Sequence, residues 1–381
     1  MARVILSSYM VRYPLGGNLS WAMQWLSGFK RLGHDVVMAE RAGYPRSCFH
    51  PLQQVYDDDS DFGCGIVSDL LARIGMEHDW YFEDATGEYH GKSRSAAEAA
   101  IRNADVFIDM GALGDWQPER VTSRLKVIID QEPGYTQMRM DAEPRIAAAL
   151  EGYDHYFTCG TNLGTPRSTA PTAGRQWTLA FNPVDPTLFS PTPPPAGAPY
   201  TTVMNWQSHK PIFYHGRTYG QKDQEFEKFM KLPRCTAAPM EIAVAGLWVP
   251  RDRLIDSGWQ IRSGMAVTTT MDSYWDYIRG SRGEFAICKN VFIATKSGWF
   301  SDRSAAYLAS GRPVVLQDTG FSSLLPHGRG LFAVNNIEEA AAAIAEIEGD
   351  YVRHAAWARE LAQDMLSVDV VIPRFLATLG L

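Results

Sequence analysis

Short apolar runs alternate with helix-forming segments along this chain, and no other feature restricts the fold as much. Residues 3–7 and 35–39 have the composition of buried strands, and residues 19–32 between them predict a helix that ends before Gly33. A strand, a loop, a helix and a second strand at this spacing begin a doubly wound sheet of parallel strands. A second alternating set begins at Tyr200. We therefore expect an α/β protein built from two such sheets.

A proline-rich segment separates the two sets. Residues 186–199 include Pro-Thr-Pro-Pro-Pro-Ala-Gly-Ala-Pro, which favours a stiff and extended linker. A chain of 381 residues also exceeds what one hydrophobic core usually serves. We predict an N-terminal Rossmann-like domain over 1–185, a linker over 186–199, a C-terminal Rossmann-like domain over 200–350, and closing helices over 351–381.

Composition excludes several classes of protein. The formal net charge of −7 gives no overall attraction to nucleic acid or to acidic lipid. No apolar stretch approaches the roughly 18 residues of a membrane span, and the first residues run directly into a strand. The five cysteines are scattered without a Cys-x-x-Cys pair, which is typical of reduced thiols. We expect a cytoplasmic protein with no signal peptide, no membrane span and no nucleic-acid partner.

The segment around residue 301 predicts a helix whose N-terminus attracts an anion. A polar cluster precedes a helix-forming run that stops at Gly311. The N-terminus of a helix carries about half a positive charge and several unpaired N–H groups, so phosphate is a natural ligand. The cluster consists of Ser301, Asp302, Arg303 and Ser304.

A strand and a turn follow that helix. Residues 313–317 are apolar and suit a buried parallel strand. The strand leads into Asp318, Thr319 and Gly320, whose small size lets a ligand approach the backbone.

Two basic residues stand together earlier in the same half. Arg217 and Lys222 are five positions apart, after a predicted strand and at a predicted helix start. They can converge on one diphosphate, where each charge-assisted contact supplies about 1.5–3 kcal/mol. An exposed basic turn is the alternative interpretation.

Three acids end predicted strands of the first half, where open α/β sheets bind their ligands. They are Asp109, Asp130 and Glu132, and the loop after the first strand adds Gly16, Gly17 and Asn18. Any of the three acids is a candidate general base for an acceptor hydroxyl, a role worth about 10²–10⁴-fold in rate. Strand-end carboxylates also cap helices or pair with arginines, and glycines also simply make turns.

Two further features have alternative readings. Residues 57–61 are rich in aspartate, but Phe62 replaces the glycine of a calcium loop and Ser68 replaces its glutamate. We therefore predict a solvated acidic loop and no metal site. The helix over 19–32 carries large apolar residues including Trp21, which predict a core face but also suit a membrane surface.

Three segments resemble GT-B glycosyltransferases. Residues 182–191 resemble the Asn-Gly-Val-Asp-x-x-x-Phe-x-Pro segment at the end of their first domain, with proline in place of the glycine. Gly216, Arg217 and Lys222 keep the spacing of their Gly-Arg-x-x-x-x-Lys element. Residues 311–315 are similar to the Gly-x-Pro-Val-Val strand that follows their diphosphate-binding helix.

The resemblance implies two Rossmann-like domains that face each other across a cleft, with the last helix returning to the first domain. It implies a hexosyltransferase-like enzyme that moves sugar from a nucleotide diphosphate sugar, such as a UDP-sugar, to a small-molecule or glycan acceptor. No metal and no cofactor beyond this co-substrate are expected. The donor would contact Arg217, Lys222, Ser301, Asp302, Arg303, Ser304, Asp318, Thr319 and Gly320, and the acceptor would contact Gly16, Gly17 and Asn18.

The sequence departs from that family at two positions. Ala306 stands where many members place a glutamate for the ribose, so ribose recognition falls to another residue such as Asp302. No histidine follows the first strand, where many inverting members keep their base. A nucleotide-sugar epimerase of the same fold and a catalytically silent sugar-nucleotide-binding protein are therefore alternatives.

Overall fold

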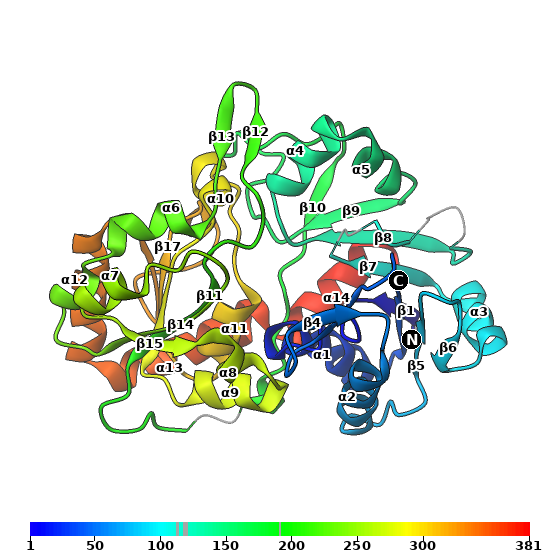
Figure 1. Cartoon of the computed structure of the whole chain (residues 1–381), viewed down its shortest axis with the longest axis horizontal. Helices are drawn as coiled ribbons and strands as arrows, with labels where there is room; N and C mark the ends of the chain where they lie inside the picture. The colour runs from blue at the N-terminus through cyan, green and yellow to red at the C-terminus, as the bar shows by residue number, and fades with distance from the viewer. Residues whose placement is uncertain (112–113, 117–120, 190–191) are drawn as a thin grey trace.

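Two parallel sheets lie side by side in the computed structural model, which describes residues 1–111, 114–116, 121–189 and 192–381 (Figure 1). The N-terminal half forms an eight-stranded sheet in the order β10-β9-β8-β7-β1-β2-β5-β6, and the C-terminal half forms a six-stranded sheet in the order β15-β14-β11-β16-β17-β18. In the first sheet β5 and β6 pair antiparallel, whereas the other pairs of both sheets are parallel. This confirms the expected α/β architecture of two doubly wound sheets.

The elements of the N-terminal half alternate as the sequence predicts. Its strands are β1 (Arg3–Ser7), β2 (Asp35–Arg41), β5 (Trp80–Glu83), β6 (Tyr89–Gly91), β7 (Val106–Met110), β8 (Leu125–Asp130), β9 (His155–Thr158) and β10 (Trp177–Leu179), with a separate hairpin β3 (Cys48–His50) and β4 (Val55–Asp57). Its helices are α1 (Gly16–Arg31), α2 (Asp61–Ala72), α3 (Arg94–Asn103), α4 (Tyr135–Ala142) and α5 (Pro144–Ala149).

The C-terminal half repeats the alternation. Its strands are β11 (Tyr200–Asn205), β14 (Met240–Ala245), β15 (Gln260–Ser263), β16 (Gly283–Ala286), β17 (Val314–Gln317) and β18 (Leu331–Val334), with a projecting hairpin β12 (Ile212–Tyr214) and β13 (Arg217–Tyr219). Its helices are α6 (Lys222–Phe226), α7 (Arg251–Asp256), α8 (Gly264–Thr268), α9 (Met271–Arg279), α10 (Asn290–Thr295), α11 (Asp302–Ala309), α12 (Ile337–Gly349), α13 (Tyr351–Leu361) and α14 (Val368–Thr378).

One local prediction is wrong. Residues 290–293, an asparagine followed by three apolar residues, suggest a short strand, but they open helix α10. A run of three apolar residues does not distinguish a strand from a buried helix, because both periodicities fit so short a segment. The tertiary structure decides for helix here, with Asn290 donating to Glu225 of α6 at 2.8 Å.

Helix α1 lies between the two sheets and contacts elements of both halves. Near its start, Ser20 accepts a hydrogen bond of 2.8 Å from the indole of Trp275 in α9. Further along, the ring of Trp25 lies 5.6 Å from that of Phe375 in α14, so the C-terminal helix packs on the first half of the chain. Trp21 and Trp25 are both buried, so the apolar face of this helix is core and the membrane alternative is wrong.

The residues just before the predicted linker hold α1. Asn182 accepts a hydrogen bond of 2.8 Å from the indole of Trp21. The carboxylate of Asp185 is fully buried and accepts a hydrogen bond of 2.7 Å from Ser27. Residues 190–191, at the end of the segment that resembles GT-B enzymes, lie outside the described residues, and the domain boundaries stay a prediction.

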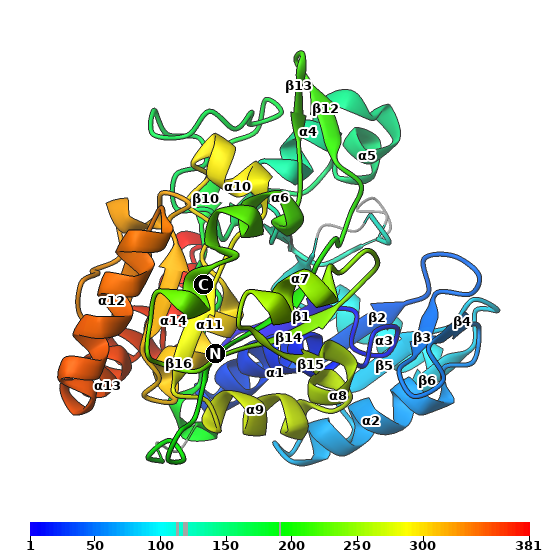
Figure 2. The ribbon, with the colours of Figure 1, turned by 60° about the vertical axis from the view of Figure 1, so that its left-hand side comes forward.

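The hairpin β12–β13 reaches from the second half toward the first. It stands beside α4 in the view of Figure 1 and again after the rotation of Figure 2. The hydroxyl of Tyr214 donates to Asp141 of α4 at 2.6 Å, and the ring of His209 stacks on that of Tyr135 at 5.1 Å. The two halves are therefore bridged above the sheets as well as through α1.

Among the helices of the described ranges, none is both long and apolar enough to cross a membrane. All five cysteines lie within those ranges, and each is a free thiol.

Alanine substitutions at Gly16 and Gly17 test the close approach of α1 to α9. A Cβ at Gly16 would lie 2.5 Å from the carbonyl oxygen of Thr270 and 2.6 Å from Cβ of Tyr274. We expect Gly16→Ala to lower the free energy of unfolding by about 1–3 kcal/mol, since the helix must move away from α9. The adjacent Gly17 has nothing within 4 Å of such a Cβ. Gly17→Ala should therefore be neutral or stabilise by up to about 1 kcal/mol in urea unfolding.

Candidate functional site

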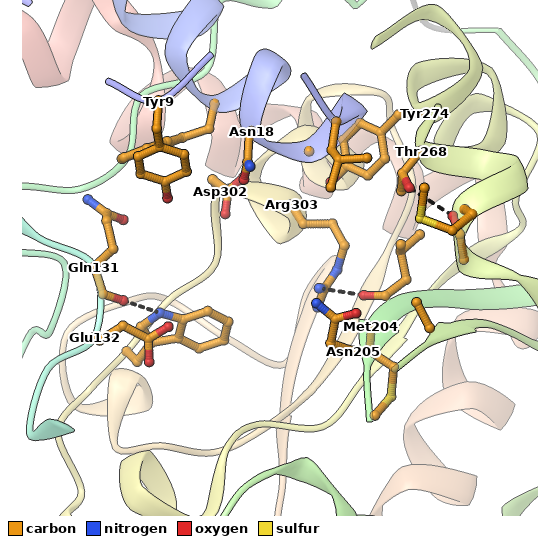
Figure 3. Close-up of a pocket in the computed structure, with 18 residues that line it drawn as sticks. Tyr9, Asn18, Gln131, Glu132, Met204, Asn205, Thr268, Tyr274, Asp302 and Arg303 are labelled. Atoms are coloured by element: carbon orange, nitrogen blue, oxygen red, sulfur yellow. Dashed lines mark hydrogen bonds between the residues drawn. The ribbon is translucent and has the colours of Figure 1, made fainter. Parts of the chain in front are cut away.

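A cavity of about 320 Å³ opens where the carboxyl ends of the strands of both sheets face each other (Figure 3). Open α/β sheets bind ligands at such ends. The first half contributes Tyr9, Leu15, Gly17, Asn18, Trp21, Gln131 and Glu132. The second half contributes Val203, Met204, Asn205, Ala245, Gly264, Met265, Thr268, Tyr274, Trp299, Asp302 and Arg303.

Arg303 forms the cationic wall of this cavity. Its guanidinium donates to the buried carboxylate of Glu284 at 2.5 Å and to the carbonyl of Val203 at 2.9 Å. The remaining Nη2 is buried without a hydrogen-bond partner. A buried donor without a partner is costly, and an anionic ligand in the cavity would supply one.

Lys222 is a second buried cation beside Arg303. The residue is only 8% exposed. Its burial, and to a lesser extent the charge of Arg303, lowers the pKa of Lys222 to about 7. Among the salt bridges of the described residues none involves this lysine, and its side chain donates no hydrogen bond there. A phosphate next to the pair would restore the charged form of the lysine.

Helix α11 begins at the cavity as the sequence predicts. Ser301 is its N-cap residue, and the Ser301 hydroxyl accepts a hydrogen bond of 3.2 Å from the amide of Arg303. The hydroxyl of Ser304 in the first turn is buried without a hydrogen-bond partner. The helix ends at Ala309, and Gly311 has a positive φ of 69°, as expected for a glycine that stops a helix.

Asp302 places a carboxylate in the cavity between the two halves. It is half-buried, and Figure 3 shows it close to Asn18 at the start of α1. Burial raises the pKa of Asp302, although Arg303 and nearby amides act in the opposite direction. A carboxylate with a raised pKa is a better proton acceptor near neutral pH.

Glu132 lies across the cavity and joins the two halves by charge. Its carboxylate contacts Lys289 at 2.5 Å and His209 at 3.8 Å, both from the C-terminal half. Burial alone would raise the pKa of Glu132, but Lys289 and then His209 outweigh it and lower the pKa to about 2. This acid is therefore held as an anion.

The structure brings only Glu132, of the three predicted acids, to the cavity. Asp130 is fully buried below the surface and accepts hydrogen bonds from Thr136 at 2.6 Å, Gln137 at 3.0 Å and the amide of Glu132 at 2.9 Å. It shapes the turn that presents Glu132. Burial raises the pKa of Asp130. Its position supports the alternative in which a strand-end acid caps local backbone.

Asp109 also lies away from the cavity. It is buried and accepts a hydrogen bond of 2.5 Å from the hydroxyl of Tyr153. Burial raises the pKa of Asp109 from 3.8 to about 7 against the opposing effect of that hydrogen bond. The carboxyl end of its strand is covered by the chain itself, which sequence spacing does not reveal.

The stability of Asp109→Asn should report this raised pKa. The folded protein holds the proton more tightly than the unfolded chain, so the contribution of Asp109 is complete below its ordinary pKa of 3.8 and is lost as the pH rises to about 7. The asparagine does not ionise and still accepts from Tyr153. We expect the variant to gain stability relative to wild type, on the order of 2 kcal/mol between pH 5 and pH 8, in urea unfolding.

The predicted acceptor glycines have different places. Gly17 and Asn18 line the cavity, and the Asn18 amide donates to the carbonyl of Tyr13 at 3.3 Å. Gly16 is buried against α9 and does not line it. Gly16 opens helix α1 and allows its close packing on α9, which neither interpretation predicts.

Arg217 does not join the diphosphate cluster. It is exposed at the tip of the β12–β13 hairpin, away from α11 in Figures 1 and 2, and its guanidinium lies 5.1 Å from the ring centroid of Tyr219. Arg217 begins strand β13, which runs from the tip of the hairpin back toward Lys222 at the start of α6. The buried cation whose charge acts on Lys222 is Arg303.

Residues 318–320 also lie outside the cavity. Asp318 accepts from the hydroxyl of Ser322 at 2.7 Å, and Thr319 donates to the carbonyl of Trp299 at 2.7 Å. The carbonyl of Gly320 accepts a hydrogen bond of 3.0 Å from Asn162. The first two bonds lie within the second half and the third joins the two halves. None of the three residues lines the cavity.

Several residues of the site escape the sequence analysis. They are Tyr9, Glu284, Lys289 and His209. The strand-end rule, applied to the predicted strand over 284–287, would have pointed to Lys289. The contact of Glu132 with His209 joins residues from different halves, and only the folded chain brings them together.

Within the described residues, His, Cys, Asp and Glu side chains form no group of three or more that could hold a metal ion. The acidic residues 57–61 form no such group either.

Comparison with known proteins gives a fold and no close relative. The sequence matches no family profile and no curated protein. Solved structures of GT-B glycosyltransferases do match over the whole chain, so the two facing Rossmann-like domains are those of the GT-B fold. The identity of about 10–13% in these matches establishes the fold alone.

Three of the matching structures illustrate this likeness. Sucrose-phosphate synthase from Thermosynechococcus elongatus matches with a TM-score of 0.56 and 13% identity, over 99% of this chain and 98% of its own. HepE from Anabaena, solved with UDP and glucose, matches with a TM-score of 0.56 and 11% identity over 100% of both chains. An alpha-glucosyltransferase, solved with UDP-glucose and DNA containing an abasic site, matches with a TM-score of 0.57 and 12% identity over 99% of both chains.

Proposed function

We propose that the protein is a glycosyltransferase that moves a hexose from a nucleotide diphosphate sugar, with a UDP-sugar as the first choice, to a hydroxyl group of an acceptor. The observation that carries the proposal is the buried Arg303, which lines an interdomain cavity with an unpaired guanidinium nitrogen and whose charge acts on the buried Lys222. The GT-B fold and the UDP and UDP-glucose bound in structures of this fold support the choice of donor.

The chemistry of the leaving group explains the cations. As the sugar leaves, negative charge grows on the departing diphosphate, and preorganised donors stabilise that charge. Arg303, Lys222 and the first amides of α11 are the groups that we assign to this role. Because these residues supply positive charge, we propose that transfer needs no divalent metal ion. Activity should then persist in EDTA.

The acceptor hydroxyl needs a proton acceptor. We assign this role to Asp302, because it lies in the cavity and burial raises its pKa. Burial would raise the pKa of Glu132, but Lys289 outweighs this effect and the pKa is lowered to about 2. Glu132 is therefore a poor base. Its role in this proposal is to keep the two halves closed around the ligands.

Lys222→Met tests the diphosphate site. The methionine keeps the length of the side chain and removes the charge, so UDP affinity should fall by about tenfold or more. The exposed Lys231, which follows the same helical segment, gives a matched control, and Lys231→Met should bind UDP as wild type does. Isothermal titration calorimetry measures both. Equal affinity of Lys222→Met and wild type would contradict the assignment.

The same lysine predicts a pH dependence. Its pKa in the free protein is lowered to about 7 by burial and Arg303, and a bound diphosphate raises it, so binding takes up a proton above pH 7. UDP affinity should fall as the pH rises above 7, by at most about tenfold per unit. Lys222→Met should lose this proton uptake in calorimetry with buffers of different ionisation enthalpy.

Asp302→Asn tests the base. We expect UDP binding within about threefold of wild type and a loss of transfer of about 10²-fold or more, because proton removal is lost. Glu132→Gln is the comparison, and it should impair the closure of the cavity more than the chemistry. If Glu132→Gln abolishes transfer while Asp302→Asn remains active, Glu132 is the base.

The class of reaction is tested by donor screening. Thermal shifts with UDP-, GDP-, dTDP- and ADP-sugars identify the donor, because a ligand that binds only the native state stabilises it. Release of the nucleoside diphosphate that depends on an acceptor supports a transferase. Epimerised donor without release would indicate an epimerase, and tight binding without turnover on any acceptor would indicate a silent binding protein.

A further inference from the structure

A path of aromatic side chains leads from the cavity to the surface of the first half. We define the tyrosine path as Tyr9, Tyr13, Tyr44 and Tyr56. The ring of Tyr9, which lines the cavity, lies 6.0 Å from that of Tyr13, and the ring of Tyr13 lies 6.1 Å from that of Tyr56. The hydroxyls of Tyr13 and Tyr44 are 3.3 Å apart. The path thus begins at the proposed reaction centre and ends in solvent.

The outer members of the path are unusually exposed for large aromatic residues. Tyr44 is 52% exposed and Tyr56 is 47% exposed, although both have aromatic neighbours. Exposed aromatic surface that is continuous with a cavity is typical of a binding surface. Tyrosine offers such a surface a rigid apolar face and a hydroxyl for polar partners.

Buried charges hold the inner part of the path in place. The fully buried carboxylate of Glu40 accepts hydrogen bonds from the amides of Val11 at 2.7 Å and Arg12 at 2.9 Å. The Arg12 guanidinium pairs with Glu40 at 3.3 Å. The backbone between Tyr9 and Tyr13 is therefore fixed from inside, so a ligand on these rings orders little new structure when it binds.

We infer that the acceptor is a neutral oligosaccharide chain that lies along the tyrosine path with its terminal hydroxyl in the cavity. This inference rests on the proposed glycosyltransferase function. Sugar rings present apolar C–H faces flanked by hydroxyls, which matches the two surfaces of tyrosine. Successive rings 6.0 and 6.1 Å apart favour an extended chain over a single small ring.

Charge around the outer end decides between neutral and anionic chains. Asp57, Asp58, Asp59 and Asp61 follow directly on Tyr56. The Arg46 guanidinium donates to the carbonyl of Tyr56, and it is the backbone amide of Arg46 that donates to Asp58. Such a surplus of carboxylates disfavours a polyanion such as DNA or a sulfated glycan. The net charge of −7 acts in the same direction.

The test uses the full-length protein saturated with UDP on a glycan microarray that carries neutral, sulfated and uronic-acid chains. We expect binding to neutral chains longer than one residue. Maltopentaose, cellopentaose and a single-stranded DNA oligonucleotide then serve as solution probes in calorimetry. Preference for DNA or for anionic glycans, or the absence of binding to any neutral chain, would overturn the inference.

Variants assign the binding to the path. The double variant Tyr13→Ala with Tyr56→Ala should weaken neutral-chain binding by about tenfold or more. Tyr13→Phe keeps the ring and should retain most of the affinity, which excludes a folding defect at this position. Phe213→Ala removes a 69% exposed aromatic outside the path and should bind as wild type. Unchanged glycan affinity in the double variant would overturn the inference.

Measurements of UDP binding distinguish a failure of the proposed function from a failure of the acceptor inference. UDP should raise the melting temperature of wild type and of the Tyr13 and Tyr56 variants equally, because neither residue lines the cavity. If wild type fails to bind any nucleotide sugar, the proposed function fails. If donor binding is intact but the path variants leave glycan binding unchanged, only the acceptor inference fails.

Discussion

The close contact between helix α1 and the second half is the constraint on which the rest of the structure depends. At Gly16 there is no room for a side chain against the backbone of Thr270, so the helix starts directly on α9. Its far end is packed by Phe375 of α14. One helix of the first domain therefore fixes how both sheets face each other. The cavity exists because the carboxyl ends of the two sheets are held at this distance.

Buried charge gives the cavity its chemical character. Glu284 is fully buried and partly satisfies Arg303, but it leaves one nitrogen of the guanidinium without a partner. A buried charge that lacks complete compensation destabilises a fold unless a ligand completes it. Burial, and then the like charge of Arg303, lowers the pKa of Lys222. Both observations favour an anionic ligand at this wall, and the carboxylate of Glu132 lies across the cavity from it.

The sequence grouped the residues at the start of α11 more readily than the strand-end acids. Ser301, Asp302, Arg303 and Ser304 are adjacent in the chain, so a capping pattern suffices to place them at one helix end. The three strand-end acids have the same local pattern, yet Asp109 and Asp130 are buried by different neighbours and only Glu132 reaches the cavity. Arg217 has the expected spacing to Lys222, but the spacing does not reveal that Arg217 lies in a projecting hairpin.

The sequence by itself determined the two alternating sets of strands and helices and the stop of α11 at Gly311, because each depends on neighbouring residues. Only the tertiary structure decided which charged groups meet. The contacts of Glu132 with Lys289 and of Arg303 with Glu284 join residues from different strands and helices. Their formation depends on the packing of whole elements, and the balance between burial and pairing of charge is set there and not by local sequence.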